Sequence, residues 1–208
     1  MNKSQFQKAA GISAGLAARW FPHIDAAMKE FGITSAIDQA MFIAQCGHES
    51  TSFTQLVESF NYSVAGLACF VKAKRITQDQ ANSLGRKSSE KALPLERQRA
   101  IANLVYSNRY GNKSAGDGWK YRGRGLKQIT FLDNYLRCGT ALKLDLVSNP
   151  QLLEKDINAA CSAAWFYTSS GCLKYPGDLI RVTQIINGGQ NGIDDRKARY
   201  LLAKSILV

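Results

Sequence analysis

Two glutamates, Glu49 and Glu58, are the only acidic or basic side chains between Asp38 and Lys72, apart from His48. Apolar, hydroxyl and amide side chains surround them in the sequence. A carboxyl group that is poorly solvated and lacks a cationic partner has a raised pKa, so it can hold a proton near neutral pH. Such a group can serve as a general acid beside an ionised carboxylate that serves as the base. The alternative is a pair of solvated surface residues.

The spacing of the two glutamates limits how they can act together. On one continuous helix they would point to opposite faces, about 13 Å apart along the axis, and could not share a substrate. The segment STSFTQLV that begins at Ser50 is rich in Ser and Thr and poor for helix continuation. A break after Ser50 would let the chain return Glu58 across a cleft. Inverting glycosidases hold their acid and base carboxyls about 6.5–9.5 Å apart, with a water between them.

The helix that must position Glu49 has clear signals at both ends. Ser35 with Asp38 resembles a capping box, and the helix that they start would end at His48 and Glu49. A carboxylate at that end meets the unfavourable pole of the helix dipole. A helix selected for stability alone would carry a lysine there, so this position favours a chemical role for Glu49.

The remaining elements are also predicted to be helical, and the fold class is mainly α. An N-terminal helix contains Pro22, which must kink it or split it in two. Thr77 with Gln80 could open a second helix, and Pro94 could lie in the first turn of a third. Later helices are expected from about Thr130 and over residues 157–167, 178–187 and 194–207. Residues 111–125 hold five glycines in 15 positions, which is typical of a functional loop.

We expect a single catalytic domain over residues 1–208. Residues 65–110 are more polar and more charged than their flanks, which predicts a smaller helical lobe inserted into a larger one. The larger lobe would then consist of residues 1–64 and 111–208. The sequence has no apolar run long enough to span a membrane and no secretory signal pattern at its start.

Composition excludes some classes of site and leaves others open. The net charge is +11, from 27 basic and 16 acidic residues, which predicts attraction to a polyanion such as nucleic acid, an anionic membrane or a cell wall. There is no long basic block of the kind found in nucleic-acid-binding arms. The five cysteines are widely spaced and the two histidines lie apart, so no metal site is predicted. We expect the cysteines to be free thiols in a reducing compartment.

Four motifs in order carry a resemblance to a known family. They are GHES followed by a second glutamate, YRGRGLKQITFLDNY, SAAWFY and QIINGGQNGIDDR, within about residues 35–200. Together they resemble glycoside hydrolase family 19, the chitinase type, and more closely its lysozyme-like endolysins from bacteriophages or prophages of Gram-negative bacteria. The resemblance implies a lysozyme-like helical fold with a groove between two lobes. It also implies hydrolysis of a β-1,4 bond in an aminosugar polymer with inversion and without a cofactor.

The resemblance assigns three catalytic positions. Glu49 matches the general acid, Glu58 matches the general base, and Thr130 matches the hydroxyl that holds the attacking water. A hydroxyl can donate and accept hydrogen bonds, so it can fix the orientation of a water molecule. Thr130 with Asp133 also reads as a capping box at a helix start, and one side-chain oxygen cannot serve both purposes.

Other positions match places that bind substrate in the family. Gln128, Asn134 and Asn187 are expected to hydrogen-bond N-acetyl groups, although NGG after a helix is also an ordinary C-terminal stop. Trp119 and Tyr121 are expected either to stack on sugar rings or to pack the glycine-rich loop.

Two further residues are expected to support the catalytic groups. His48 would hold the loop of the acid. Arg196 matches a position that supports the base carboxylate; its alternative is a surface cation on a helix.

The expected function is that of an endolysin, a muramidase that cuts peptidoglycan between N-acetylmuramic acid and N-acetylglucosamine. The chain lacks the long sugar-binding loops of plant chitinases, which favours peptidoglycan over chitin. The protein would be a monomer in the host cytoplasm until a separate pore-forming protein releases it to the cell wall. Its basic C-terminal segment would contact anionic lipid or, alternatively, pack Tyr200, Leu201 and Ile206 against the core.

Two other functions remain open at this point. A chitinase would turn over chitin oligomers rather than purified peptidoglycan. A basic helical nucleic-acid-binding protein would explain the charge, although we expect no nucleic-acid partner. It would shift nucleic acid in a gel across salt concentrations without lysing permeabilised cells.

Overall fold

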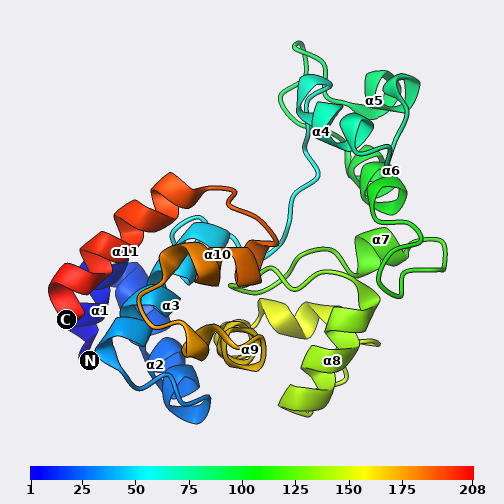
Figure 1. Ribbon diagram of the computed structural model, residues 1–208. Coiled ribbons are helices and arrows are strands. Elements are labelled where there is room, and N and C mark those ends of the chain that lie inside the picture. Colours follow the sequence, from blue (N-terminus) through cyan, green and yellow to red (C-terminus); the bar gives the residue numbers. More distant parts are fainter.

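The computed structural model describes residues 1–208 and consists almost entirely of helices (Figure 1). Extended pairing is limited to isolated bridges. The mainly α prediction is confirmed. The α-helices are α1 (Lys3–Ala10), α2 (Ala14–Glu30), α3 (Ala36–Glu49), α4 (Ala68–Lys72), α5 (Gln78–Leu84), α6 (Leu95–Val105), α7 (Asp117–Lys120), α8 (Leu132–Leu142), α9 (Asp156–Ser169), α10 (Leu179–Asn187) and α11 (Ile193–Leu207). Short 3₁₀ helices cover η1 (Ala65–Leu67), η2 (Pro150–Glu154) and η3 (Cys172–Lys174).

Local sequence signals account for several helix starts. The Ser35 side chain accepts a hydrogen bond from the Asp38 N–H at the start of α3, and Thr77 forms a complete capping box with Gln80 at the start of α5. Pro94 occupies the N-cap position of α6, one residue before its first turn. These starts agree with the predictions to within a residue or two, the usual uncertainty of helix ends.

Helix α2 departs from one prediction because it continues through Pro22 as a single element. A proline inside a helix removes one backbone hydrogen bond and costs about 3 kcal/mol. Trp20, Ile24 and Met28 are buried on the same helix, and their burial offsets that cost. The alternative in which Pro22 splits this segment into two helices is therefore wrong.

The main core surrounds α3, which is buried along most of its length and packs against α1, α9 and α11. Figure 1 shows α1 and α11, from the two ends of the chain, lying together beside α3. Within α11, Tyr200 is buried and Ile206 packs on the core, but Leu201 is 54% exposed. The predicted closing helix is thus present, and the packing of Leu201 was predicted wrongly.

A second apolar cluster belongs to the segment that stands apart from the body of the molecule in Figure 1. It is built on α4, α5 and α6, and its core includes Phe60, Leu67 and Ile101. Trp119 packs on the same cluster, so this packing unit extends beyond residues 65–110 at both ends. A third cluster lies around α8 and includes Tyr121 and Tyr135. None of the helices combines the length and hydropathy needed to cross a membrane.

Candidate active site

Glu49 is the last residue of α3, and the helix ends directly after it. The Ser50 hydroxyl donates to the Cys46 carbonyl at 2.6 Å and accepts from the Phe53 N–H at 3.0 Å. The next residues, Thr51, Ser52 and Phe53, have φ values of 49°, 57° and 65°. Left-handed conformations are uncommon outside glycine, so tertiary contacts must hold this turn; here the Phe53 ring is fully buried. The predicted break after Ser50 is confirmed.

An extended segment then brings Glu58 beside the glycine-rich loop. The Glu58 N–H donates to the Gly123 carbonyl at 2.9 Å, and the Gly125 N–H donates to the Leu56 carbonyl at the same distance. A Cβ at Gly123 would lie 2.8 Å from the Gln128 Oε1 and 3.3 Å from the Glu58 Cβ. A side chain at 123 would therefore displace the Gln128 amide and crowd Glu58, because the loop backbone passes directly against the segment that carries this carboxylate.

Glu49 and Glu58 line one open cleft of about 670 Å³. They come from the end of α3 and from the segment that follows its break, so the turn at Ser50 places them on a shared space. The other residues that line the cleft are Tyr106, Arg109, Tyr110, Lys127, Gln128, Ile129, Thr130, Phe131, Asn134, Phe166, Ile186, Asn187 and Gly188.

The carboxylate of Glu58 accepts a hydrogen bond on each oxygen. The Tyr106 hydroxyl donates to Oε1 at 2.7 Å, and the Gly123 N–H donates to Oε2 at 3.0 Å. Burial raises the pKa of Glu58 above its ordinary value, although both hydrogen bonds and the nearby Arg122 oppose the shift. Burial and the neighbouring Glu58 also raise the pKa of Tyr106, so its hydroxyl keeps its proton and remains a donor. Glu58 is therefore an ionisable group with a raised proton affinity and hydrogen bonds that fit its charged form.

Replacing Tyr106 with phenylalanine should move the acidic limb of the pH–rate profile to higher pH. In the wild-type protein the hydrogen bond from Tyr106 lowers the pKa of Glu58. Without this bond the pKa of Glu58 rises further, so less of the carboxyl is ionised at a given acidic pH. Initial rates of the wild-type and Tyr106→Phe proteins between pH 4 and 8 would measure the shift. An unchanged or acid-shifted limb would contradict a role for ionised Glu58.

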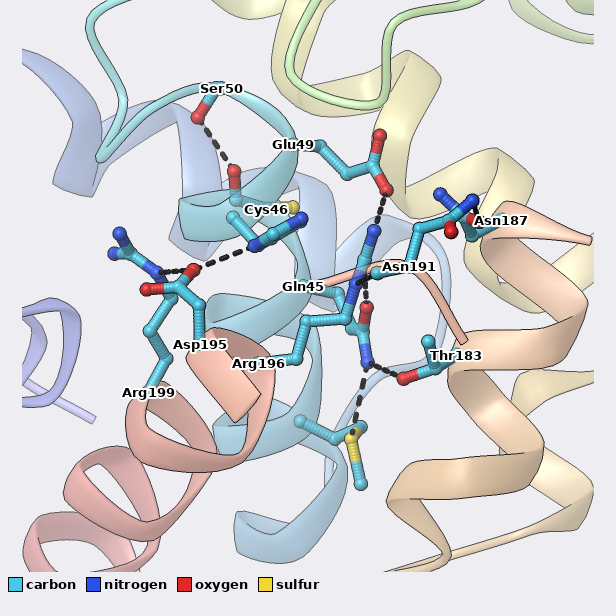
Figure 2. Close-up of polar contacts among 12 residues, drawn as sticks. Gln45, Cys46, Glu49, Ser50, Thr183, Asn187, Asn191, Asp195, Arg196 and Arg199 are labelled. Carbon is cyan, nitrogen blue, oxygen red and sulfur yellow. Dashed lines mark hydrogen bonds and ion pairs between the residues drawn. The ribbon is translucent and has the colours of Figure 1, made fainter. Parts of the chain in front are cut away.

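Glu49 forms an ion pair with a residue far away in the sequence. The Nη2 of Arg196 lies 2.6 Å from the Glu49 Oε1, and the Arg196 side chain is almost completely buried (Figure 2). Arg196 also donates to the Gln45 Oε1 and, at 3.1 Å, to the Asn191 carbonyl. The second oxygen of Glu49 points away from Arg196 and has no hydrogen-bond partner within the protein. One oxygen of Glu49 is thus fixed, and the other is free for a ligand.

This ion pair corrects three expectations. Glu49 does have a cationic partner; Arg196 supports Glu49 rather than Glu58; and Arg196 is a buried residue rather than a surface cation. The two residues are 147 positions apart in the sequence. They meet because α11 packs along α3, a tertiary contact that local charge spacing cannot reveal.

Gln45 extends this network into the core. It is 2% exposed, accepts from Arg196 and donates its amide to the Thr183 Oγ1 at 3.1 Å (Figure 2). Gln45 precedes Glu49 by four residues, so both lie on one face of α3. A polar residue within this apolar helix is a sequence signal of the network, although it does not identify the partners.

Thr130, Gln128 and Asn134 all line the cleft. The Thr130 hydroxyl donates to the Gln128 carbonyl at 2.9 Å, which leaves its acceptor lone pairs for a ligand or water. Helix α8 begins at Leu132 with Phe131 at the N-cap position and has no side-chain cap. The alternative in which Thr130 and Asp133 form a capping box is therefore wrong. The Asn134 amide donates to the Thr130 carbonyl at 2.9 Å, which ties this residue to the same loop.

Asn187 and His48 occupy different surroundings. Asn187 lines the cleft at the end of α10. Gly188 follows it with a left-handed φ of 76°, a conformation that ends many helices. The NGG motif therefore both ends the helix and places Asn187 at the cleft. The His48 Nδ1 lies 2.6 Å from the Asp195 Oδ2, outside the residues that line the cleft. Arg199 also donates to Asp195 and to the Ser52 hydroxyl. His48 is therefore placed to support the turn after Glu49.

Trp119 and Tyr121 do not line the cleft. Tyr121 is only 3% exposed, and its hydroxyl donates to the Val147 carbonyl at 3.2 Å. Trp119 packs on the second apolar cluster, and the guanidinium of Arg122 lies 3.8 Å from its ring centroid. Their expected stacking on sugar rings does not fit this placement, whereas the packing alternative does. The aromatic residues that line the cleft are Tyr106, Tyr110, Phe131 and Phe166.

Two carboxylates that line one cleft are the arrangement that acid–base glycoside hydrolases use. A Haemophilus influenzae protein described as a glycosyl hydrolase family 19 domain-containing protein is 37% identical over 190 residues, which cover 86% of this chain and 89% of that protein. The family described as chitinase class I matches residues 92–191. This chain belongs to glycoside hydrolase family 19.

Other comparisons cover the fold or short stretches. The crystal structure of chitinase C from Streptomyces griseus matches 99% of this chain and 91% of its own with a TM-score of 0.57. At 16% identity this likeness shows the fold alone, and it confirms the predicted lysozyme-like helical architecture. Endochitinase 1 of Theobroma cacao is 42% identical over 57 residues, which cover 27% of this chain and 18% of that protein.

Proposed function

We propose that this protein is a bacteriolytic endolysin of a phage or prophage that hydrolyses the β-1,4 bond between N-acetylmuramic acid and N-acetylglucosamine in peptidoglycan. The observation that carries the proposal is the placement of Glu49 and Glu58 on one cleft with different partners. The net charge of +11 supports an anionic wall polymer as the substrate rather than neutral chitin.

In the proposed reaction, Glu58 is the general base. Hydrogen bonds to both of its oxygens suit the ionised form, and its raised pKa makes it a stronger base toward water. The free lone pairs of Thr130 accept a hydrogen bond from the same water and orient it toward the sugar.

Glu49 is the general acid in this reaction. Its Oε1 accepts from Arg196 while the unpaired oxygen carries the proton to the departing glycosidic oxygen. As the proton leaves, negative charge develops on Glu49 beside the Arg196 guanidinium, so the ion pair is stronger in the transition state than in the protonated ground state. Burial alone was expected to keep Glu49 protonated; the ion pair instead favours proton donation. The reaction needs one carboxyl that holds a proton and one that has lost it, so we expect a bell-shaped pH–rate profile.

Thr130→Ala should lower kcat about 10-fold, because one hydrogen bond to the attacking water is lost. The melting temperature should change little, since Thr130 caps no helix. Steady-state rates and thermal denaturation of the same preparation would test both parts. A large loss of stability, or an unchanged kcat, would count against a water-positioning hydroxyl.

Mass spectrometry of fragments released from purified peptidoglycan tests the proposed bond specificity. A muramic acid at the new reducing end is expected. A reducing-end glucosamine would show that the other glycosidic bond is cut. Turnover of chitin oligomers without release of wall fragments would replace the proposal with a chitinase.

The proposed biological setting needs its own test. A protein that acts on the wall from the host cytoplasm requires a pore-forming partner for release. Expression in a Gram-negative host should therefore cause lysis only when a pore-forming protein is co-expressed. Lysis without that partner would contradict this part of the proposal.

A further inference from the structure

We infer that the outer end of the cleft, bounded by Arg109, Tyr110 and Phe131, binds the acidic stem peptide that peptidoglycan carries on its lactyl groups. This inference rests on the proposed function, because only a peptidoglycan strand brings such a peptide to the cleft. It adds a second recognition element beside the sugar-binding part.

The cleft continues into a second hollow beyond the catalytic carboxylates. This outer hollow has a volume of about 570 Å³ and shares Tyr110, Phe131 and Asn134 with the cleft. Its other lining residues are Asp133, Leu136 and Arg137, from the first turns of α8. A chain attached to a sugar in the cleft can therefore pass over the Tyr110–Phe131 rim into the outer hollow.

Arg109 lines the cleft without an acidic partner. It takes part in none of the ion pairs of the protein, and its side chain donates no hydrogen bond. Its guanidinium lies 4.9 Å from the ring centroid of Phe131 and 5.4 Å from that of Tyr110. The rings hold the guanidinium in place, and its donors remain free for the planar, bidentate contact that a carboxylate offers.

Phe131, at this rim, has a strained backbone conformation. Phe131 has φ 74° and ψ 146°, a conformation that side chains other than glycine rarely adopt. Its ring packs between Tyr106 and Tyr110, with centroid distances of 4.8 and 5.0 Å. Strain of this kind persists at sites where the surrounding structure enforces it, and here it places the ring beneath Arg109.

The outer hollow fits a peptide better than a further sugar. Tyr110 is 62% exposed and Leu136 is 56% exposed, so the hollow offers apolar surface to small methyl side chains. Asp133 and Arg137 line it with opposite charges and form no ion pair with each other. A stem peptide of alanine, glutamate and diaminopimelate has methyl groups, several carboxylates and one ammonium group. Its net negative charge complements Arg109 and Arg137, and its ammonium group complements Asp133.

The test compares initial rates on two forms of one substrate. Soluble glycan strands that carry their stem peptides are compared with strands from which an amidase has removed those peptides. The Arg109→Ala variant should lower the ratio of the first rate to the second about 10-fold, the effect of one charge-assisted hydrogen bond. Arg75→Ala is the matched control, because Arg75 is exposed between α4 and α5, lies outside the cleft and forms no ion pair, and its loss changes the net charge equally. The ratio for this control should stay at the wild-type value.

A second variant keeps the test decisive if Arg109→Ala folds poorly. Leu136→Asp places a carboxylate at an exposed position of the hollow and should lower the same ratio. An unchanged ratio in the folded Arg109→Ala and Leu136→Asp proteins would overturn the inference while leaving the proposed function standing. Failure of the wild-type protein to cleave either strand would instead overturn the proposed function.

Discussion

Glu49→Gln should reduce the rate of glycan hydrolysis at least about 10³-fold, within the range that a lost general acid produces. The amide keeps the shape of the side chain, and its oxygen can still accept from Arg196. It has no transferable proton, so the leaving oxygen would depart as an alkoxide. Release of reducing ends from soluble glycan strands gives the rate.

This variant should also lose some stability. The substitution leaves Arg196, whose side chain is 1% exposed, without its counter-ion, and such changes cost a few kcal/mol, about 3–5 at most. Rates must therefore be compared well below the melting temperature of the variant. Glu90→Gln is the control, since Glu90 pairs with Arg97 outside the cleft, and it should keep wild-type activity. Robust hydrolysis by folded Glu49→Gln protein would remove Glu49 from the catalytic role.

Glu58→Gln should abolish hydrolysis to a similar degree, about 10³-fold, because the amide cannot take a proton from water. Its effect on stability should have the opposite sign to that of Glu49→Gln. The amide oxygen can accept from the Gly123 N–H while its NH₂ donates to the Tyr106 hydroxyl, so both hydrogen bonds are kept. The substitution removes a buried charge without leaving an unpaired group.

The pH dependence of that stability difference follows from the raised pKa of Glu58. Above this raised pKa the wild-type protein folds with an ionised, desolvated carboxylate, which lowers its stability relative to the neutral amide. As the pH falls through the folded-state pKa, the carboxyl takes up a proton and this loss of stability diminishes. Below the ordinary pKa of glutamate the loss of stability is absent. The melting temperature of Glu58→Gln should therefore exceed that of the wild type at pH 7, and the two should converge at about pH 4. A less stable variant at pH 7 would contradict a destabilised base.

The sequence predicted the local parts of the candidate site better than the tertiary ones. The cap at Ser35, the end of α3 at Glu49 and the break at Ser50 depend on neighbouring residues, and each was found at its expected place. The ion pair of Glu49 with Arg196 and the hydrogen bond from Tyr106 to Glu58 join segments 147 and 48 positions apart. No spacing rule reaches such contacts, because they depend on how helices pack.

Two errors have a common physical cause. Thr130 and Asp133 match the pattern of a capping box, but Phe131 occupies the N-cap position in a strained conformation that no propensity would favour. Tyr121 lies beside the glycine-rich loop and was a candidate to stack on a sugar, but it is buried in the cluster around α8. In both cases the packing of the loop against α8 outweighed the local preference. Helix α1 begins with a capping box at Asn2 and Gln5 that the sequence analysis did not use.

The anomeric form of the first product tests most directly whether Glu49 and Glu58 act as acid and base on one water molecule. Proton NMR of soluble glycan strands, recorded before the new reducing end mutarotates, distinguishes the two stereochemical outcomes. Attack by a water that Glu58 activates requires inversion, so the β-1,4 bond should yield the α-anomer first. Initial release of the β-anomer would show retention through a covalent intermediate and would contradict the proposed roles of both glutamates.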